Sequence, residues 1–597
     1  MSPVESWLDQ RNRLTTELYA HPYDLVLYIE RAEAYSQLRY HDLAAGDAHR
    51  ALLLTDEAQD DAEEYHEQAQ AALAARLNNP NLRTKSVNAA LVRVSSEQER
   101  DPSDDPEDDD DDDLEDEEAR FVSKVALQMA LQCYSLLSHS LLRCGCLKSA
   151  LDFANRGLAA FPDELSLLRV MGLVMADVRT FYSKDDLQLG DFDKDELPDQ
   201  GRARREVYPW NDYEPERFSD ESLAFLNSEM AKVAPKCEVR ATELPVLTES
   251  GPASASVKQR TMKQLGIFAK EDIRPGEVVL HEHSALIANN RLHESLCDAC
   301  SSVLPDITST RNPVDTDAVS QVVSCPDCVD IFFCNEACLQ LALETYHPAV
   351  CGKEVETIAK NVPMKETSEA LYLLLLLRAM ATAESTDTHP LDLKEVKHIW
   401  GEFEAPAPAS AAHHDPSNPS DSKAGNELLP FSFTYNIATP LHVLEKMDLD
   451  IYALLPRYDL WILNTLYAKF RGTASARVSL RDGRPEVCAV HPMWCLANHS
   501  CDPNVAWEWG AEMQFWARER RLSGPAGGKK SGGIAKGEEV LNHYCDIELP
   551  VRERREWAAG SLGGWCMCER CVREEGEEKE KERVTAVKLK EEGGGIG

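Results

Sequence analysis

The chain has 597 residues, of which 103 are acidic and 63 are lysine or arginine, so its formal charge is −40. This length predicts about three or four domains, each able to bury a core. The negative charge disfavours nonspecific attachment to a nucleic-acid backbone or an anionic membrane, and it favours a basic protein partner.

The termini and apolar runs indicate where the protein resides. Residues 1–14 carry charges and no apolar core, so a secretory signal is not expected. The longest apolar run, Ala370 to Leu377, ends at Arg378 and falls short of the roughly 20 residues that a spanning helix needs, so it predicts a buried helix. We expect an intracellular protein of the nucleus, the cytoplasm or both. In such a compartment the 18 cysteines are expected to bind metal rather than form disulfides.

The first third of the chain has helical periodicity. Small and apolar residues recur at helical spacings in residues 27–56, which predicts closely packed helices. A second helical segment, 134–162, contains Gly157 and closes with Phe161-Pro162, and it resembles a tetratricopeptide repeat. The alternative is a plain helical bundle that supports the rest of the chain, because a repeat period constrains architecture and not ligand.

Three segments have compositions that do not favour a packed core. Residues 101–118 hold 14 acidic residues and no basic one, which predicts a disordered linker or, alternatively, a lure for basic proteins. Residues 404–426 are rich in Pro, Ala, Ser and Asp, which predicts a mobile insertion. The charged, glycine-ended residues 573–597 predict a frayed tail.

Eight potential metal ligands occur as four spaced pairs within 55 residues: Cys297 and Cys300, Cys325 and Cys328, Cys334 and Cys338, and His347 and Cys351. Two four-coordinate zinc ions account for all eight. The series is similar to a MYND finger, whose ligand pairs interleave. That resemblance assigns one ion to Cys297, Cys300, Cys334 and Cys338, and the other to Cys325, Cys328, His347 and Cys351.

Two later motifs carry the functional prediction. Residues 497–504 read Ala-Asn-His-Ser-Cys-Asp-Pro-Asn, and residues 537–544 read Gly-Glu-Glu-Val-Leu-Asn-His-Tyr. This order resembles the carboxyl half of a SET-domain lysine methyltransferase. Residues 265–277 resemble the opening hairpin of that family, where a glycine lets the backbone approach the cofactor. The resemblance covers residues 237–572, and the finger lies inside it as in the SET-and-MYND subfamily.

The resemblance implies a methyl-transfer site. It places S-adenosylmethionine against Leu265, Gly266, Ile267, Asn498, His499 and Tyr544. It also makes Tyr544 the catalytic residue, because its hydroxyl would orient the substrate amine. Methyl transfer to lysine needs a neutral amine in line with the leaving sulfur, and a dehydrated channel favours the neutral amine. A thiol nucleophile at Cys501 with His499 as its base is the competing chemistry, and it lacks an orienting acid.

A third zinc ion is expected near the C-terminus. Cys566, Cys568 and Cys571 supply three ligands, whereas a structural zinc site needs four. The resemblance supplies Cys501 as the fourth. Such a metal would tie the C-terminal segment to the Asn498-His499 segment.

These observations predict a multidomain α+β protein with a helical TPR-like region followed by a mostly β SET fold that carries a MYND-like finger, a helical insertion and a cysteine-rich post-SET segment. The predicted boundaries are 1–99 (TPR-like), 100–120 (acidic linker), 121–235 (TPR-like region and connector), 236–296 (first part of SET), 297–351 (finger), 352–470 (helical insertion), 471–548 (SET core), 549–572 (post-SET) and 573–597 (tail).

The function that the resemblance implies is an S-adenosylmethionine-dependent protein-lysine N-methyltransferase with three structural zinc ions. Its substrate is expected to be a basic histone or non-histone protein, with peptide partners for the TPR-like and MYND-like regions and no direct binding of nucleic acid or membrane. The alternative is a non-catalytic interaction scaffold with a degenerate SET module, which Gln264-Leu265 and Gly564 favour because the family has other residues there.

Overall fold

A computed structural model of the chain describes residues 3–98, 112–204, 207–245, 247, 261–289, 296–305, 322–328, 331–355, 366–400, 428–478, 485–510, 512–522, 531–562 and 564–593. Contacts divide the chain into two compact units, one of Met1–Pro209 with Glu404–Thr465 and one of Trp210–Phe403 with Leu466–Gly597. Among the described residues, no helix is both long enough and apolar enough to cross a membrane.

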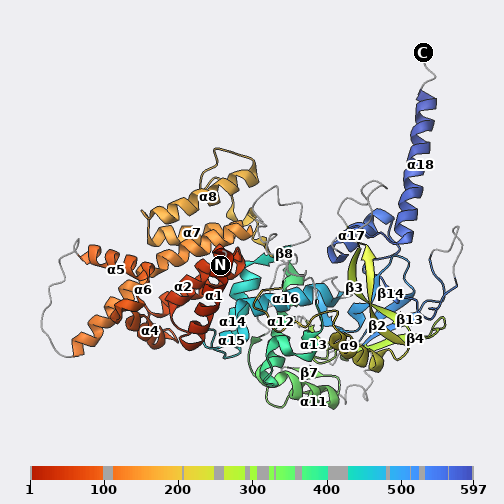
Figure 1. Ribbon diagram of the computed structural model, residues 1–597, viewed down its shortest axis with the longest axis horizontal. Helices are drawn as coiled ribbons and strands as arrows, with labels where there is room; N and C mark the ends of the chain where they lie inside the picture. The colour runs from red at the N-terminus through yellow and green to blue at the C-terminus, as the bar shows by residue number, and fades with distance from the viewer. Residues whose placement is uncertain are drawn as a thin grey trace. The chain divides into compact units, whose positions relative to one another are not determined.

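The first unit is mainly helical (Figure 1). Its helices are α1 (Pro3–Ala20), α2 (Leu25–Gln37), α3 (His41–Glu57), α4 (His66–Asn78), α5 (Lys85–Gln98), α6 (Asp112–Cys144), α7 (Leu147–Ala160), α8 (Leu165–Tyr182), α14 (Thr439–Lys446) and α15 (Leu455–Tyr458). β1 (Gln200–Arg204) and β8 (Leu428–Ser432) form an antiparallel pair. Helix α3 packs against both α2 and α6. The helices predicted for residues 27–56 are therefore confirmed by α2 and α3.

Small residues let these helices approach closely. A Cβ atom at Gly46 of α3 would lie 2.3 Å from Leu460 Cδ2, and one at Gly157 of α7 would lie 2.9 Å from Tyr134 Cβ on α6. A larger side chain at Gly157 would press on the Cβ of Tyr134 at a cost in stability, whereas at Gly46 the side chain of Leu460 would have to move. Gly157, on which the TPR resemblance partly rests, thus lies at a helix contact.

A buried ion cluster joins the segment around residue 459 to the N-terminal helices. Arg31 Nε lies 2.7 Å from Asp47 Oδ2, and Arg31 Nη1 lies 3.0 Å from Asp459 Oδ2. The side chains are at most 2% exposed. Because an unpaired buried charge is costly, this arrangement favours one packing of α2, α3 and the chain near Asp459. Residues up to Thr465 therefore belong to the helical unit, although the sequence analysis placed them in a SET insertion.

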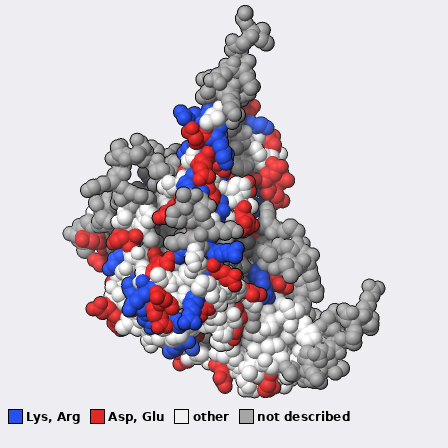
Figure 2. Space-filling model, turned by 90° about the vertical axis from the view of Figure 1, so that its right-hand side faces the viewer, with Lys and Arg blue, Asp and Glu red and all other residues white. Residues whose placement is uncertain are grey.

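Two segments predicted to be irregular are partly helical. Helix α6 begins at Asp112, so residues 112–118 of the acidic run are helical, while residues 101–111 lie outside the described residues. Helix α18 (Glu569–Gly593) includes most of the predicted tail. Its described part carries interspersed acidic and basic side chains (Figure 2), and pairs such as Arg573 with Glu577 lie one helical turn apart. The predicted insertion 404–426 lies outside the described residues.

The second unit combines small sheets with helices (Figure 1). Its strands are β2 (Cys237–Pro245), β3 (Thr261–Ala269), β4 (Val278–His283), β5 (Leu286–Asn289), β6 (Val323–Ser324), β7 (Phe332–Phe333), β9 (Ala474–Val478), β10 (Pro485–Val490), β11 (Asn498–His499), β12 (Val505–Trp509), β13 (Glu512–Ala517) and β14 (Leu541–Asn542). The antiparallel sheets have the orders β2-β3, β12-β13-β4, β5-β10-β9 and β6-β7, whereas β11 and β14 pair in parallel.

Its helices are α9 (Asp220–Val233), α11 (Glu336–Thr345), α12 (Thr367–Ser385), α13 (Lys394–Lys397), α17 (Val551–Leu562) and α18, and α16 (Leu460–Thr473) contains the boundary between the units. Helix α12 contains Ala370–Leu377, and its apolar side chains there are buried, which confirms the predicted buried helix.

A hydrophobic core positions β3 beside the later strands. Leu265 and Ile267 alternate inward along β3 and pack with Met230 of α9, Val540 and Phe515. The period of two matches a strand with one face on the core. Burial of these side chains contributes about 1.5–3 kcal/mol each and fixes the register of β3.

Candidate active site and metal clusters

The chain at 498–504 lies against the strand that follows Glu539. β11 and β14 pair in parallel, with Asn498 opposite Leu541. The buried side chain of Asn504 adds two bonds: its Nδ2 donates to the Glu539 carbonyl oxygen, and its Oδ1 accepts from the Leu541 N–H, both at 2.7 Å. These bonds satisfy backbone groups that would otherwise be buried unpaired.

Strand β3 places Gly266 beside Asn498 and Glu539. The Val540 N–H donates to the Ile267 carbonyl oxygen at 2.7 Å, so the chain after residue 537 runs beside β3. A Cβ atom at Gly266 would lie 2.5 Å from Glu539 Oε1 and 3.0 Å from Asn498 Nδ2. Only glycine leaves room for both side chains at this point.

Two acceptors orient the amide of Asn498. Its Nδ2 donates to the Leu265 carbonyl oxygen at 2.9 Å and to Glu539 Oε1 at 2.7 Å. Burial raises the pKa of Glu539, and the bond from Asn498 opposes that rise. Both amide hydrogens are thus used, so Oδ1 points elsewhere and, within the described parts of the chain, accepts no hydrogen bond. It can accept one from a ligand ammonium or hydroxyl group.

Tyr544 is anchored at both ends. Its backbone N–H donates to His499 Nδ1 at 3.0 Å, and its hydroxyl donates to the Ala497 carbonyl oxygen at 2.7 Å. Burial raises the pKa of the phenol, as do the negative charges of Cys495 and Glu539 in their ionised forms. The phenol is therefore neutral at pH 7, and its oxygen keeps lone pairs for an incoming N–H donor.

The first metal cluster consists of Cys297, Cys300, Cys334 and Cys338. Its four sulfur atoms lie within 4.8 Å of one another, and Cys334 Sγ is 3.7 Å from Cys300 Sγ and 3.6 Å from Cys338 Sγ. Tetrahedral zinc with Zn–S bonds of about 2.3 Å requires sulfur separations of about 3.8 Å. The donor set and the spacing therefore fit zinc.

The second metal cluster consists of Cys325, Cys328, His347 and Cys351, and its ligand atoms also lie within 4.8 Å of one another. Cys325 Sγ is 3.8 Å from Cys351 Sγ, and Cys328 Sγ is 3.6 Å from His347 Nε2. The structure thus gathers the two interleaved sets that the sequence analysis grouped.

The third metal cluster consists of Cys501, Cys566, Cys568 and Cys571, with ligand atoms within 4.8 Å of one another. Three arginines surround it. Arg554 Nη2 donates to Cys571 Sγ at 3.7 Å, Arg555 Nε to the Cys566 carbonyl oxygen at 2.9 Å, and Arg570 Nη1 to the Cys501 carbonyl oxygen at 2.8 Å. Each arginine is also paired with a glutamate of α18, Arg554 and Arg570 with Glu574 and Arg555 with Glu575. These side chains therefore tie α17 and α18 to the cluster, whose donor set itself fits zinc.

Comparisons with known proteins identify the central region. Residues 264–545 match the family model of the SET domain. Histone-lysine N-methyltransferase ATXR2 of Arabidopsis thaliana is 24% identical to the chain over 305 residues, which are 42% of this chain and 62% of that protein. The chain therefore spans less than two thirds of that relative's length. The family model places a SET domain at residues 264–545, and the relative is consistent with the SET family.

Within the SET region, the structure brings together the predicted residues Gly266, Asn498, His499 and Tyr544. Leu265 and Ile267 flank Gly266 on β3 and contribute their carbonyl oxygens to the contacts described above. Their binding of a cofactor stays a prediction.

Sequence reasoning gave no role to three polar groups at this site. Glu539 orients Asn498, Asn504 bridges to the strand, and Cys545 joins His499 and Cys501 in a further group of nearby ligand atoms. Glu539 and Asn504 lie inside the two recognised motifs, and that position is the only signal that could have marked them.

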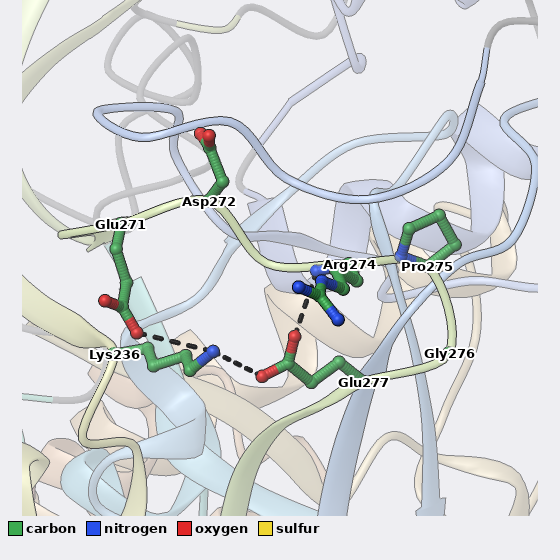
Figure 3. Close-up of a pocket in the computed structure, with 7 residues that line it drawn as sticks. All are labelled: Lys236, Glu271, Asp272, Arg274, Pro275, Gly276 and Glu277. Carbon is green, nitrogen blue, oxygen red and sulfur yellow. Dashed lines mark hydrogen bonds and ion pairs between the residues drawn. The ribbon is translucent and has the colours of Figure 1, made fainter.

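A surface hollow at the turn between β3 and β4 is a separate feature (Figure 3). Lys236 Nζ lies 3.3 Å from Glu271 Oε1 and 2.5 Å from Glu277 Oε1, and Glu277 also accepts from the Arg274 N–H. These charges pair with one another across the turn. These interactions therefore stabilise the turn. None of the predicted site residues lines the hollow.

Proposed function

We propose that the chain is an S-adenosylmethionine-dependent protein-lysine N-methyltransferase. The observation that carries the proposal is the convergence of Gly266, Asn498 and Tyr544 from three separate segments of the SET region. The Arabidopsis relative is named a histone-lysine N-methyltransferase, which supports the reaction class.

The proposed cofactor site consists of Leu265, Gly266, Ile267, Asn498, His499 and Tyr544. S-adenosylmethionine, when bound, supplies a methyl group on a positively charged sulfur. The free Oδ1 of Asn498 would accept from its ammonium group, and the space that lacks a Cβ at Gly266 admits close approach. The carboxylate of Glu539 adds a negative charge beside that position.

Tyr544 would orient the substrate amine. Its hydroxyl hydrogen is engaged by Ala497, so its oxygen is an acceptor and holds the amine by one N–H. The amine must first lose its proton to solvent, which frees its lone pair to accept the methyl group that bound S-adenosylmethionine would supply. Burial around Tyr544 favours the neutral amine because the ammonium form loses hydration there.

The remaining parts serve structure and partner binding in this proposal. Three zinc ions occupy the three clusters, the finger is of MYND type, and the helical unit is TPR-like and captures peptides. The substrate is a basic protein of the nucleus or cytoplasm, histone or non-histone, because the chain carries a formal charge of −40. The fit of the clusters to zinc and the close helix contacts at Gly157 support these assignments.

Labelled S-adenosylmethionine with a cell extract tests the proposal without a guess about substrate. Transfer of label to protein by the native chain, with loss of transfer by Tyr544→Phe, is the expected result. A chain that is folded and zinc-loaded but transfers no label to any protein would instead be the non-catalytic scaffold.

A further inference from the structure

His499 lies between the third metal cluster and Tyr544. Its Nδ1 is 3.0 Å from the Tyr544 backbone nitrogen, and its Nε2 is 3.3 Å from Cys501 Sγ. The imidazole and phenol rings are 5.2 Å apart at 51°. One side chain thus contacts a metal-ligating sulfur and the residue assigned to orient the substrate.

The hydrogen bonds determine the tautomer of this imidazole. A backbone N–H can only donate, so Nδ1 must present its lone pair to Tyr544. The neutral ring then carries its hydrogen on Nε2, which points to Cys501 Sγ. Zinc in the third cluster would keep Cys501 as a thiolate, which is a strong acceptor for that hydrogen. Both contacts are satisfied by a single protonation pattern.

We propose that His499 is a positioning residue through which the third metal cluster holds the backbone of Tyr544. The inference rests on the proposed function only for its consequence in methyl transfer. Without a thiolate at Cys501, the ring loses one of its two anchors and holds the Tyr544 N–H less firmly. Asn498 is not part of this chain of contacts, since its amide is held by Leu265 and Glu539.

Two substitutions separate the contacts of the ring. The side-chain oxygen of asparagine reaches the position of Nδ1, so His499→Asn keeps an acceptor for the Tyr544 N–H and loses the donor to Cys501. The side-chain nitrogen of glutamine reaches the position of Nε2, so His499→Gln keeps that donor and loses the acceptor. Cys568→Ser removes one ligand of the third cluster, and a zinc count checks the loss of that ion.

Residue-resolved hydrogen exchange of the full chain is the readout. Cys568→Ser is expected to speed exchange at the Tyr544 amide about fivefold to tenfold in the native background, the effect of losing one hydrogen bond, and to have no further effect when combined with His499→Asn. The Leu541 amide, which donates to Asn504, is the internal control and keeps its rate. Equal acceleration by Cys568→Ser in both backgrounds, or none in either, overturns the inference.

If Cys568→Ser does not fold, the two histidine variants decide the matter in zinc-loaded protein. His499→Gln should speed exchange at Tyr544 most, because it removes the acceptor, and His499→Asn should speed it by a smaller factor, because it removes the anchor at Cys501. A native exchange rate in His499→Asn contradicts the inference. Exchange needs no turnover, so absence of methyl transfer would remove the proposed function and leave this result standing. If the enzyme is active but exchange at the Tyr544 amide does not depend on the third metal cluster, only the inference about His499 is wrong.

Discussion

The interior of the helical unit and the site of the SET region are stabilised in different ways. Long helices bury many small and apolar side chains, and the ion cluster around Arg31 is enclosed by that packing. The SET site instead uses strands of two residues, β11 and β14, held by side-chain bonds from Asn504 and by the third metal cluster. So short a ladder contributes little alone. The site therefore depends on a few specific polar contacts and on clustered potential metal ligands, whereas the helical unit depends on distributed packing.

Metal removal should separate the two regions most strongly. Native protein is expected to contain three zinc ions per chain by elemental analysis, and Cys566→Ser should contain two. Because a structural zinc contributes about 10–16 kcal/mol in small domains, chelation should unfold the finger and the C-terminal segment and spare the helical unit. Limited proteolysis locates the loss. Two ions in native protein, with Cys501 freely alkylated, would break the comparison.

Arg31→Met tests the helical unit in the same way. It leaves Asp47 buried without its partner and Asp459 with only Arg50, whose Nη1 lies 3.8 Å from Asp459 Oδ1. A loss of about 3–5 kcal/mol is expected in denaturant unfolding of that unit. Arg13→Met is the control, because the Arg13–Glu17 pair on α1 is exposed and its loss should fall within experimental error. Similar midpoints for the two variants would show that packing alone holds the unit.

Acid should weaken both regions through histidines whose pKa is lowered in the folded state. Burial lowers the pKa of His491 to about 3, and burial with nearby arginines lowers that of His49 to about 3. The unfolded histidines, with a pKa near 6.5, take up protons first, so stability falls as the pH drops from about 6.5 toward 3. Each should cost about 2 kcal/mol by pH 5. Denaturant unfolding at pH 7 and pH 5 measures this in the helical unit. In the SET region burial raises the pKa of Glu282 to about 7, so the folded state takes up that proton first and offsets the loss at His491. A net loss there is expected only from competition of protons for the metal ligands.

The spacing at Gly266 gives a smaller effect. Gly266→Ala would place a methyl group against Glu539 and Asn498, so we expect a destabilisation of about 1–3 kcal/mol and about tenfold weaker cofactor binding by calorimetry. Gly510→Ala, where the added carbon meets nothing within 4 Å, is the matched control. Unchanged cofactor affinity in Gly266→Ala would place the ligand away from β3.

The sequence predicted features with local patterns better than contacts between distant segments. The sequence grouped the clustered cysteines and histidine by their short spacings, and the family resemblance marked Asn498 and Tyr544. The structure brings these residues together, and their roles stay predictions. The attachment of Asp459 to Arg31 was not predicted, because a pair separated by 428 positions leaves no local pattern. The helical start of α6 at Asp112 also escaped prediction, since its acidic composition indicated disorder and packing further along the helix decided otherwise. The bond from Asn498 to Glu539 depends on the approach of three segments and appears only in the fold.

The central claim is that Tyr544 orients the amine while Asn498 holds the cofactor. Calorimetric S-adenosylmethionine binding and a methylation assay on Tyr544→Phe and Asn498→Ala test it most directly. The account predicts that Tyr544→Phe binds the cofactor nearly as well as the native chain and turns over about a hundredfold more slowly, whereas Asn498→Ala loses cofactor affinity. Near-normal turnover by Tyr544→Phe would contradict it, because the tyrosine ring would then only line the site and its hydroxyl would not orient the amine.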